Sequence, residues 1–233
     1  MNRQEALTQL QEENLEVTEK GKESFNKAFP LKILNLYAGI GGNRKLWNGN
    51  IEVTAIEHNK DIAKIYQDFF PNDKVIVCDA HQYLLEHFDE FDFIWSSPPC
   101  PSHSRIRIHS AVARGQNKPL FPDMKLYEEI IFLKHYFKGE WVVENVVSYY
   151  DPLIKPFECG MHYYWSSFII NNIKIKSREH DGGIEALQKL KGFDLSKYSN
   201  VDKKLLLRNC VEPELALQIF KMAFKEKQKT LPL

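Results

Sequence analysis

The sequence predicts an α/β fold with a mostly parallel, doubly wound sheet of the Rossmann-like type. Short apolar runs alternate along the chain with segments of helical periodicity, an order typical of parallel sheets. A glycine-rich turn follows the first apolar run, as in nucleotide-binding α/β domains. The chain has 233 residues, of which 43% are hydrophobic, a size that suits one domain with one core.

The first strand is expected at residues 32–36, and it leads into glycines 39, 41 and 42. Three helices are expected between and after the strands: one ends at Pro71, one runs from Asp123 to Gly139, and one begins at Pro213. Further buried strands are expected at residues 51–56, 74–78, 91–95 and 141–143.

An antiparallel hairpin is expected near the end of the sheet. Residues 163–170 and 173–175 flank Asn171 and Asn172, a pair that suits a tight turn. The polar residues 1–28 form an N-terminal extension. Residues 29–233 are then expected to form a single domain.

Composition excludes several classes of protein. Lys+Arg and Asp+Glu both total 31, so net charge gives no sign of a nucleic-acid partner. The four cysteines lack a CxxC pair, which argues against a metal site or a disulfide framework and favours a cytoplasmic protein. No apolar run approaches the length of a membrane span, so no membrane partner is expected.

The turn after the first strand has the features of a nucleotide-binding turn. Its glycines allow a ligand to approach the backbone, but Arg44 stands where a dinucleotide fingerprint needs a third glycine. Glu57 and Asp79 end the next two strands, where they can accept hydrogen bonds from ribose hydroxyls and from an exocyclic amine. The alternative is a structural turn with solvated acids.

A rigid turn after the fourth strand carries a candidate nucleophile. Pro98 and Pro99 fix the backbone before Cys100, so the thiol is held in one position. Glu144 follows the fifth strand. Taken alone, Cys100 could be a structural cysteine and Glu144 a capping acid.

Together these residues resemble the cytosine-5 DNA methyltransferases, in which the same motifs occur in the same order. The motifs are the glycine turn at residues 37–42, Pro98-Pro99-Cys100, Glu144-Asn145-Val146 and a closing Asn209-Cys210-Val211. The resemblance implies a class I fold that binds S-adenosyl-L-methionine and releases S-adenosyl-L-homocysteine. The cofactor residues it implies are Tyr37, Ala38, Gly39, Ile40, Gly41, Gly42, Glu57, His58, Asp79, Ala80, Pro98, Asn209 and Cys210.

The resemblance also implies the chemistry. Cys100 attacks C6 of a cytosine flipped out of double-stranded DNA, C5 takes the methyl group, and Glu144 holds the base at N3 and the amino group. Residues 102–119 match the mobile loop that closes on DNA. The nucleic-acid contacts expected there and beyond are Ser102, His103, Arg105, Arg107, Arg114, Lys118 and Arg178.

Three positions depart from the family pattern. Pro101 replaces a glutamine, Arg208 replaces a glycine, and residues 161–170 lack the Gln-x-Arg-x-Arg strand. Arg105 and Arg178 are alternative sources of the missing arginine. Only residues 171–203 remain for target recognition, which predicts a short target sequence or a separate recognition or restriction partner for a monomeric enzyme.

Other functions remain open at this point. A tRNA cytosine-5 methyltransferase would share the same catalytic residues. An amino-methyltransferase acting on cytosine N4 or adenine N6 would use Ser97-Pro98-Pro99 but needs an aromatic residue where Cys100 stands. The chain could also be an inactive cofactor-binding or DNA-binding subunit, or use a modified sulfonium donor. A prokaryotic or phage origin is expected.

Overall fold

The computed structural model describes residues 29–116, 118, 120–171, 173 and 183–224. The predicted N-terminal extension and Arg178 lie outside these residues. None of the helices in the described part of the chain is long and apolar enough to cross a membrane.

A seven-stranded sheet forms the centre of the molecule, with the strand order β3-β2-β1-β4-β5-β7-β6. The first five strands pair in parallel, and β7 is antiparallel to both β5 and β6. The predicted fold class is therefore confirmed. The strands are β1 (Leu31–Leu36), β2 (Ile51–Ile56), β3 (Lys74–Ile76), β4 (Phe93–Ser96), β5 (Glu140–Val146), β6 (Phe157–Cys159) and β7 (His162–Ser166).

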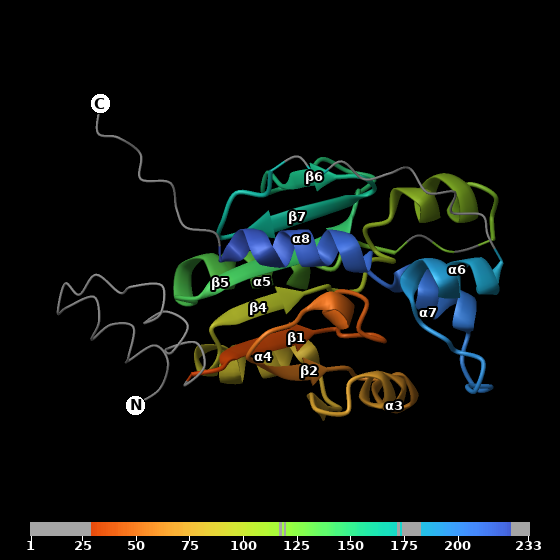
Figure 1. Cartoon of the computed structure of the whole chain (residues 1–233). Helices are drawn as coiled ribbons and strands as arrows, with labels where there is room; N and C mark the ends of the chain where they lie inside the picture. The colour runs from red at the N-terminus through yellow and green to blue at the C-terminus, as the bar shows by residue number, and fades with distance from the viewer. Residues whose placement is uncertain (1–28, 117, 119, 172, 174–182, 225–233) are drawn as a thin grey trace.

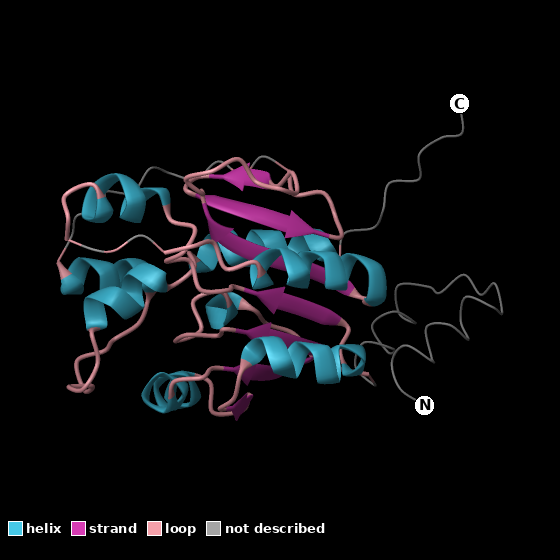
Figure 2. Ribbon diagram, turned by 180° about the vertical axis from the view of Figure 1, so that it is seen from behind, coloured by secondary structure: helices cyan, strands magenta, loops and turns pink. Residues whose placement is uncertain are grey.

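Helices cover both faces of the sheet. In Figure 1, α8 lies in front of the strands, and Figure 2 shows α4 and α5 on the opposite face. Figure 1 also shows α6 and α7 together beyond one end of the strands. The helices are α3 (Lys60–Phe69), α4 (Ala80–His87), α5 (Lys125–Tyr136), α6 (Ile184–Lys191), α7 (Lys203–Asn209) and α8 (Pro213–Ala223), with short turns η1 (Arg44–Leu46), η2 (Phe88–Glu90) and the π-helix η3 (Arg107–Val112).

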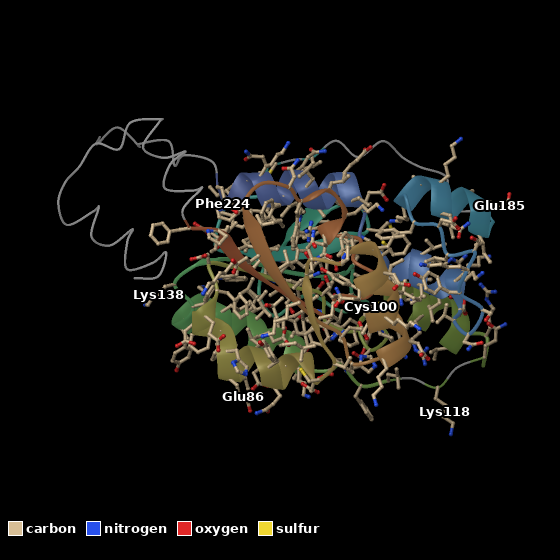
Figure 3. All side chains as sticks on the ribbon, turned by 60° about the horizontal axis from the view of Figure 1, so that its bottom comes forward. Glu86, Cys100, Lys118, Lys138, Glu185 and Phe224 are labelled. Carbon is tan, nitrogen blue, oxygen red and sulfur yellow. The ribbon has the colours of Figure 1, made fainter. Side chains whose placement is uncertain are left out.

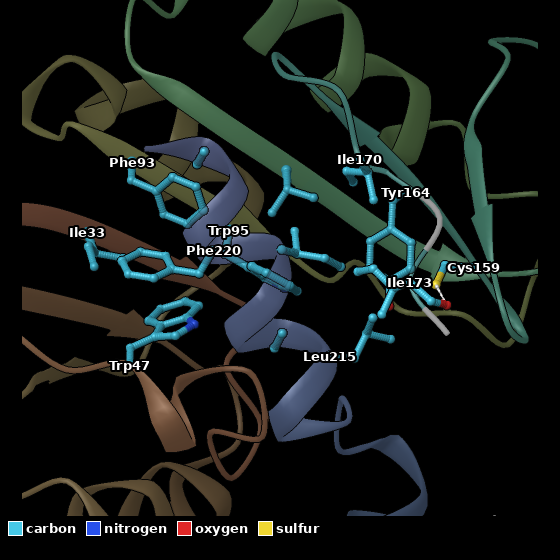
Figure 4. Packing of buried hydrophobic residues seen from close by; sticks show 14 of the residues in the cluster. Ile33, Trp47, Phe93, Trp95, Cys159, Tyr164, Ile170, Ile173, Leu215 and Phe220 are labelled. Atoms are coloured by element: carbon cyan, nitrogen blue, oxygen red, sulfur yellow. Dashed lines mark hydrogen bonds between the residues drawn. The ribbon is translucent and has the colours of Figure 1, made fainter. Parts of the chain in front are cut away.

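The alternation of side chains along each strand produces two cores. Ile33 and Val142 pack toward α8, whereas Leu34 and Val143 pack toward α4 and α5. Figure 4 shows the α8 side, where Trp47 stacks on Phe220 with ring centroids 4.9 Å apart. Because the central strands β1, β4 and β5 are buried on both faces, they are apolar runs rather than alternating ones.

The hairpin lies earlier in the chain than predicted. It joins β6 to β7 around Gly160, which has φ +62°, a value that glycine adopts readily. Asn171 is not in a strand, and Asn172 lies outside the described residues. Ile170 and Ile173 are buried against α8 instead of pairing across a turn, so their apolar character reflects core packing.

The strand order places the C-terminal ends of β1 and β4 side by side. To one side of this point the sheet continues to β2 and β3, and to the other it continues to β5. Ligands of doubly wound sheets bind at such a reversal of strand order. The glycine turn follows β1 and the Pro-Pro-Cys turn follows β4, so the fold brings the two main motifs together.

Candidate active site

A cavity opens where β1 and β4 end. Five residues expected from the sequence to bind the cofactor line it: Tyr37, His58, Asp79, Ala80 and Pro98. The sequence analysis did not single out Leu126 and Lys125 of α5, or Pro99, as cavity residues. His103 and Asp123 complete the lining.

The glycine turn has a backbone that requires its glycines. Gly39 has φ +54° and Gly41 has φ +85°. A Cβ on Gly41 would lie 2.3 Å from the ring of Phe70 and 2.9 Å from that of Tyr66, so a side chain at this position would require these rings to move. Tyr37 also has φ +54°, which is strained for a residue with a Cβ.

Glu57 supports the glycine turn directly. Its Oε2 accepts a hydrogen bond from the Gly39 amide at 3.0 Å, and its Oε1 accepts one from the Asn59 amide at 2.9 Å. His58 is largely exposed and lies 3.1 Å from the same Oε1. A carboxylate offers about four lone-pair sites, so Glu57 can hold the turn and still accept from a ligand.

Asp79 is the N-cap of α4. Its carboxylate accepts a hydrogen bond from the Gln82 amide at 2.9 Å, and that bond is the main reason why the pKa of Asp79 is below its usual value. The residue is therefore charged where it lines the cavity. It combines a capping role with a position from which it can accept from a ligand.

The Pro-Pro-Cys turn, which carries Cys100, is hydrogen-bonded to β5. The side-chain amide of Asn145 donates to the Pro98 carbonyl at 3.0 Å, and this bond is buried. Beyond the turn, the amides of His103 and Ser104 both donate to the Cys100 carbonyl at 3.0 Å. Figure 3 shows Cys100 near the middle of the molecule. The Pro-Pro-Cys and Glu-Asn-Val motifs thus form one unit.

Cys100 and Glu144 influence each other electrostatically. Burial raises the pKa of the Cys100 thiol above its usual value, and the negative charge of Glu144 raises it further. Glu144 is itself only 7% exposed. The thiol is therefore protonated near neutral pH until a ligand or a conformational change alters its surroundings.

His162 is a site residue that the sequence analysis missed. Its Nε2 lies 3.6 Å from Oε1 of Glu144, because β7 pairs with β5 in a register that puts His162 opposite Val146. Arg105 lies near Tyr163 on the same strand, where its charge opposes the burial that raises the pKa of that tyrosine. A lone histidine in the sequence gave no sign of this contact, which depends on strand register.

The loop after Cys100 differs in part from the expected mobile loop. Arg105, Arg114 and Lys118 are exposed, and Figure 3 shows Lys118 at the edge of the molecule. Arg107 and Ser102 are half-buried.

His103, which the sequence predicted as a nucleic-acid contact, is only 1% exposed. Its Nδ1 contacts the Tyr150 hydroxyl at 2.5 Å, and its Nε2 has no hydrogen-bond partner in the described part of the chain. Burial lowers the pKa of His103, although Asp123 opposes the shift. In this structure His103 lines the cavity.

The closing motif packs behind the glycine turn. A Cβ on Gly42 would lie 2.3 Å from the Cys210 sulfur, and Ile40 is buried in the same apolar cluster as Cys210. Ala38 is also buried. Asn209 is the last residue of α7. Neither Asn209 nor Cys210 lines the cavity. Burial raises the pKa of Cys210 to about 12, so this thiol is a packing group.

Several known proteins are similar to this chain. The human tRNA (cytosine(38)-C(5))-methyltransferase is 30% identical over 142 residues, which cover 58% of this chain and 36% of that protein. The rat protein of the same name is 34% identical with the same coverage. A structure of a DNMT2 mutant from Spodoptera frugiperda covers 50% of this chain and 35% of its own, with 25% identity and a TM-score of 0.34.

The matched region spans only about a third of the length of these curated relatives, 36% in each case. Residues 31–146 match the family model of the C-5 cytosine-specific DNA methylases. That match contains the glycine turn, Glu57, Asp79, the Pro-Pro-Cys turn and Glu144. On these residues and their arrangement, the chain belongs to the cytosine-5 methyltransferase family.

Proposed function

We propose that this chain transfers a methyl group from S-adenosylmethionine to C5 of a cytosine in double-stranded DNA, with Cys100 as the nucleophile. The observation that carries the proposal is the buried bond from Asn145 to the Pro98 carbonyl. It fixes the Cys100 turn against the strand that carries Glu144, so that one base can contact both side chains.

The cavity fits a nucleoside cofactor with a charged tail. It combines the apolar side chains of Pro98 and Leu126 with the carboxylate of Asp79, and the unpartnered Nε2 of His103 is a buried polar atom in its wall. Asp79 and Glu57 would accept from the adenine amine and the ribose hydroxyls. S-adenosylmethionine supplies an electrophilic methyl group when bound and leaves as S-adenosylhomocysteine.

Cys100 performs the covalent steps. Its thiol loses a proton, and a sulfur lone pair forms the bond to C6, which makes the former C5=C6 electron pair available to bond the methyl carbon at C5. Loss of the C5 proton then returns electrons to the ring as the sulfur–C6 bond breaks. This step restores the C5=C6 double bond of the base and releases Cys100 as a thiolate.

Glu144 and His162 hold the base during these steps. Glu144 accepts from the cytosine amino group and shares a proton with N3, where negative charge develops after attack at C6. His162 lies 3.6 Å from the same carboxylate and its side chain is 40% exposed, so a base can reach it. Its ring N–H can donate to the base carbonyl or to Glu144.

The exposed cations beyond Cys100 support a nucleic-acid substrate. The described residues between Cys100 and Phe121 include Arg105, Arg114 and Lys118 and no acidic residue, which suits contact with phosphates. The target base must leave the duplex to reach Cys100, at a cost of about a few kcal/mol. We propose that the enzyme acts as a monomer and that a separate recognition or restriction partner supplies sequence specificity.

A tRNA substrate is the second candidate. The curated relatives that match this chain are named tRNA (cytosine(38)-C(5))-methyltransferases, and catalysis at cytosine C5 would use the same Cys100 and Glu144. A base in an RNA loop is already unstacked, so the cost of flipping falls.

Mass spectrometry of nucleosides tests both candidates. The chain is incubated with S-adenosylmethionine and either double-stranded DNA or tRNA, and Cys100→Ser serves as the control. New 5-methylcytosine in DNA that is absent with Cys100→Ser supports the proposal. Product in tRNA and not in DNA would establish the second candidate, and methylation that persists in Cys100→Ser would refute the covalent role of this residue.

A further inference from the structure

One fully buried carboxylate lies beneath the site and takes no part in the proposed chemistry. Glu129 on α5 is 0% exposed. A buried carboxylate is costly unless several donors satisfy it, so its partners indicate why the fold retains it.

Three side chains from three different elements meet at Glu129. The hydroxyl of Tyr37, just after β1, donates to Oε1 at 2.6 Å. The hydroxyl of Ser96, the last residue of β4, donates to Oε2 at 2.6 Å. Nδ1 of His81, in the first turn of α4, lies 3.1 Å from Oε1. In this arrangement Glu129 is the shared acceptor.

Each of these elements carries a different part of the site. Tyr37 begins the glycine turn and lines the cavity. Ser96 directly precedes the turn that holds Cys100. His81 lies two residues after Asp79, the N-cap of the same helix. Leu126, one turn before Glu129 on α5, also lines the cavity.

The contacts with Glu129 change the pKa values of two of its partners. Hydrogen bonding to Glu129 is the largest cause that raises the pKa of His81 above its usual value, and Nε2 of His81 lies 3.4 Å from Glu128. Burial and then the charge of Glu129 raise the pKa of the Tyr37 hydroxyl, so that hydroxyl stays a donor. The hydrogen bond from Tyr37 also holds the residue in its strained φ of +54°.

We propose that Glu129 is a positioning residue that sets the geometry of the cofactor half and the nucleophile half of the site independently, through Tyr37 and through Ser96. The proposal rests on the proposed function for what the cavity binds. It makes two separable predictions, because the two hydroxyls reach different oxygens of the carboxylate.

The test measures two properties of the full chain other than turnover. The first is the Kd of S-adenosylhomocysteine by calorimetry, and the second is the rate at which iodoacetamide alkylates Cys100, read by peptide mass spectrometry. Tyr37→Phe should raise the Kd about tenfold, the loss expected for one hydrogen bond to a charged group, and leave the alkylation rate unchanged.

Ser96→Ala should act in the opposite way. It should leave the Kd unchanged and speed alkylation of Cys100 about fivefold, because the half-buried thiol gains exposure when its turn loosens. Glu129→Gln should change both properties, and adding Tyr37→Phe to it should raise the Kd no further. The matched control is Glu128→Gln, the same substitution at the exposed neighbour on α5, which should change neither.

Three results would overturn the proposal. A Glu129→Gln variant that unfolds at lower temperature but keeps the wild-type Kd and alkylation rate would show a structural role only. Equal effects of Tyr37→Phe and Ser96→Ala on both properties would refute the separation. Additive effects of Glu129→Gln and Tyr37→Phe on the Kd would show that Tyr37 does not act through Glu129. If wild-type chain does not bind S-adenosylhomocysteine, the proposed function and the cofactor half fail together, while the alkylation rates still decide the nucleophile half.

Discussion

At the scale of single residues, Cys100 and Glu144 have opposing requirements. In the proposed mechanism Glu144 lies near Cys100 to hold the base, yet the burial of the thiol and the charge of Glu144 both raise the pKa of Cys100. The thiol of Cys100 is therefore protonated near neutral pH in the free protein, which makes it a weak nucleophile. Proximity of the two side chains favours a reaction only when substrate is bound.

This opposition predicts different effects of Glu144→Gln on two measurements. Without the carboxylate charge the pKa of Cys100 falls, so iodoacetamide should alkylate Cys100 faster at pH near 8 and the pH at which the rate rises should shift downward. Methyl transfer should fall by about a hundredfold or more, because the base loses its charged partner. Slower alkylation in Glu144→Gln would contradict the electrostatic coupling.

His162 gives a second prediction at this scale. His162→Ala removes the ring that lies beside Glu144 and should lower methyl transfer about tenfold, with unchanged affinity for S-adenosylhomocysteine. His162→Arg should retain most of the activity, since it keeps a donor at this place. His135→Ala, at an exposed position on α5, is the matched control. Equal activity of His162→Ala and wild type would exclude a role for the residue.

At the scale of elements, the sequence predicted the parallel strands better than the helices between them. The central strands β1, β4 and β5 are buried on both faces and appear as apolar runs, whereas α4 was not predicted. Its eight residues include three that are buried: Ala80, His81 and Leu84. Ala80 is small and His81 is polar, so only Leu84 marks the buried face of this helix in the sequence. The N-cap Asp79 was the available signal, although its carboxylate was predicted only as a ligand.

The packing of α4 on α5 predicts a pH dependence of stability. Glu129, mainly through its hydrogen bond, and Glu128 raise the pKa of His81 above its usual value. Burial and Lys125 act in the opposite direction but do not outweigh them. A raised folded-state pKa stabilises the protein fully below the unfolded pKa, and this contribution is lost as pH rises through the folded value. His81→Gln should therefore destabilise the chain more at about pH 5.5 than at about pH 9, as measured by urea unfolding. A larger loss at high pH would contradict a charged His81.

At the scale of the whole molecule, two segments far apart in the sequence meet: the glycine turn and the short connection between α7 and α8. The Gly42 backbone lies against Cys210 and Val211, so α7 and α8 close over the first turn of the fold. The sequence placed the closing motif near the cofactor by resemblance, but only the fold shows that Cys210 packs and does not line the cavity. Such a role depends on contacts between residues far apart in the sequence.

Gly42→Ala tests this closure. The added Cβ would lie 2.3 Å from the Cys210 sulfur and 2.6 Å from the Val211 carbonyl oxygen, so the chain should lose about 3 kcal/mol of unfolding free energy. Gly183→Ala is the matched control, because a Cβ there meets nothing within 4 Å, and its effect should stay within about 1 kcal/mol. Similar stabilities of the two variants in urea unfolding would show that the closing motif can move away from the turn.

The most direct test of the central claim is a trapped covalent complex. A duplex with 5-fluorocytosine lets the sulfur–C6 bond form but blocks release, because fluorine at C5 cannot leave as the proton does. With S-adenosylmethionine and this duplex, or the same base in tRNA, peptide mass spectrometry should find the methylated base attached to Cys100, and Cys100→Ser should form no adduct. Methylation of ordinary cytosine without any adduct at Cys100 in either nucleic acid would contradict the mechanism.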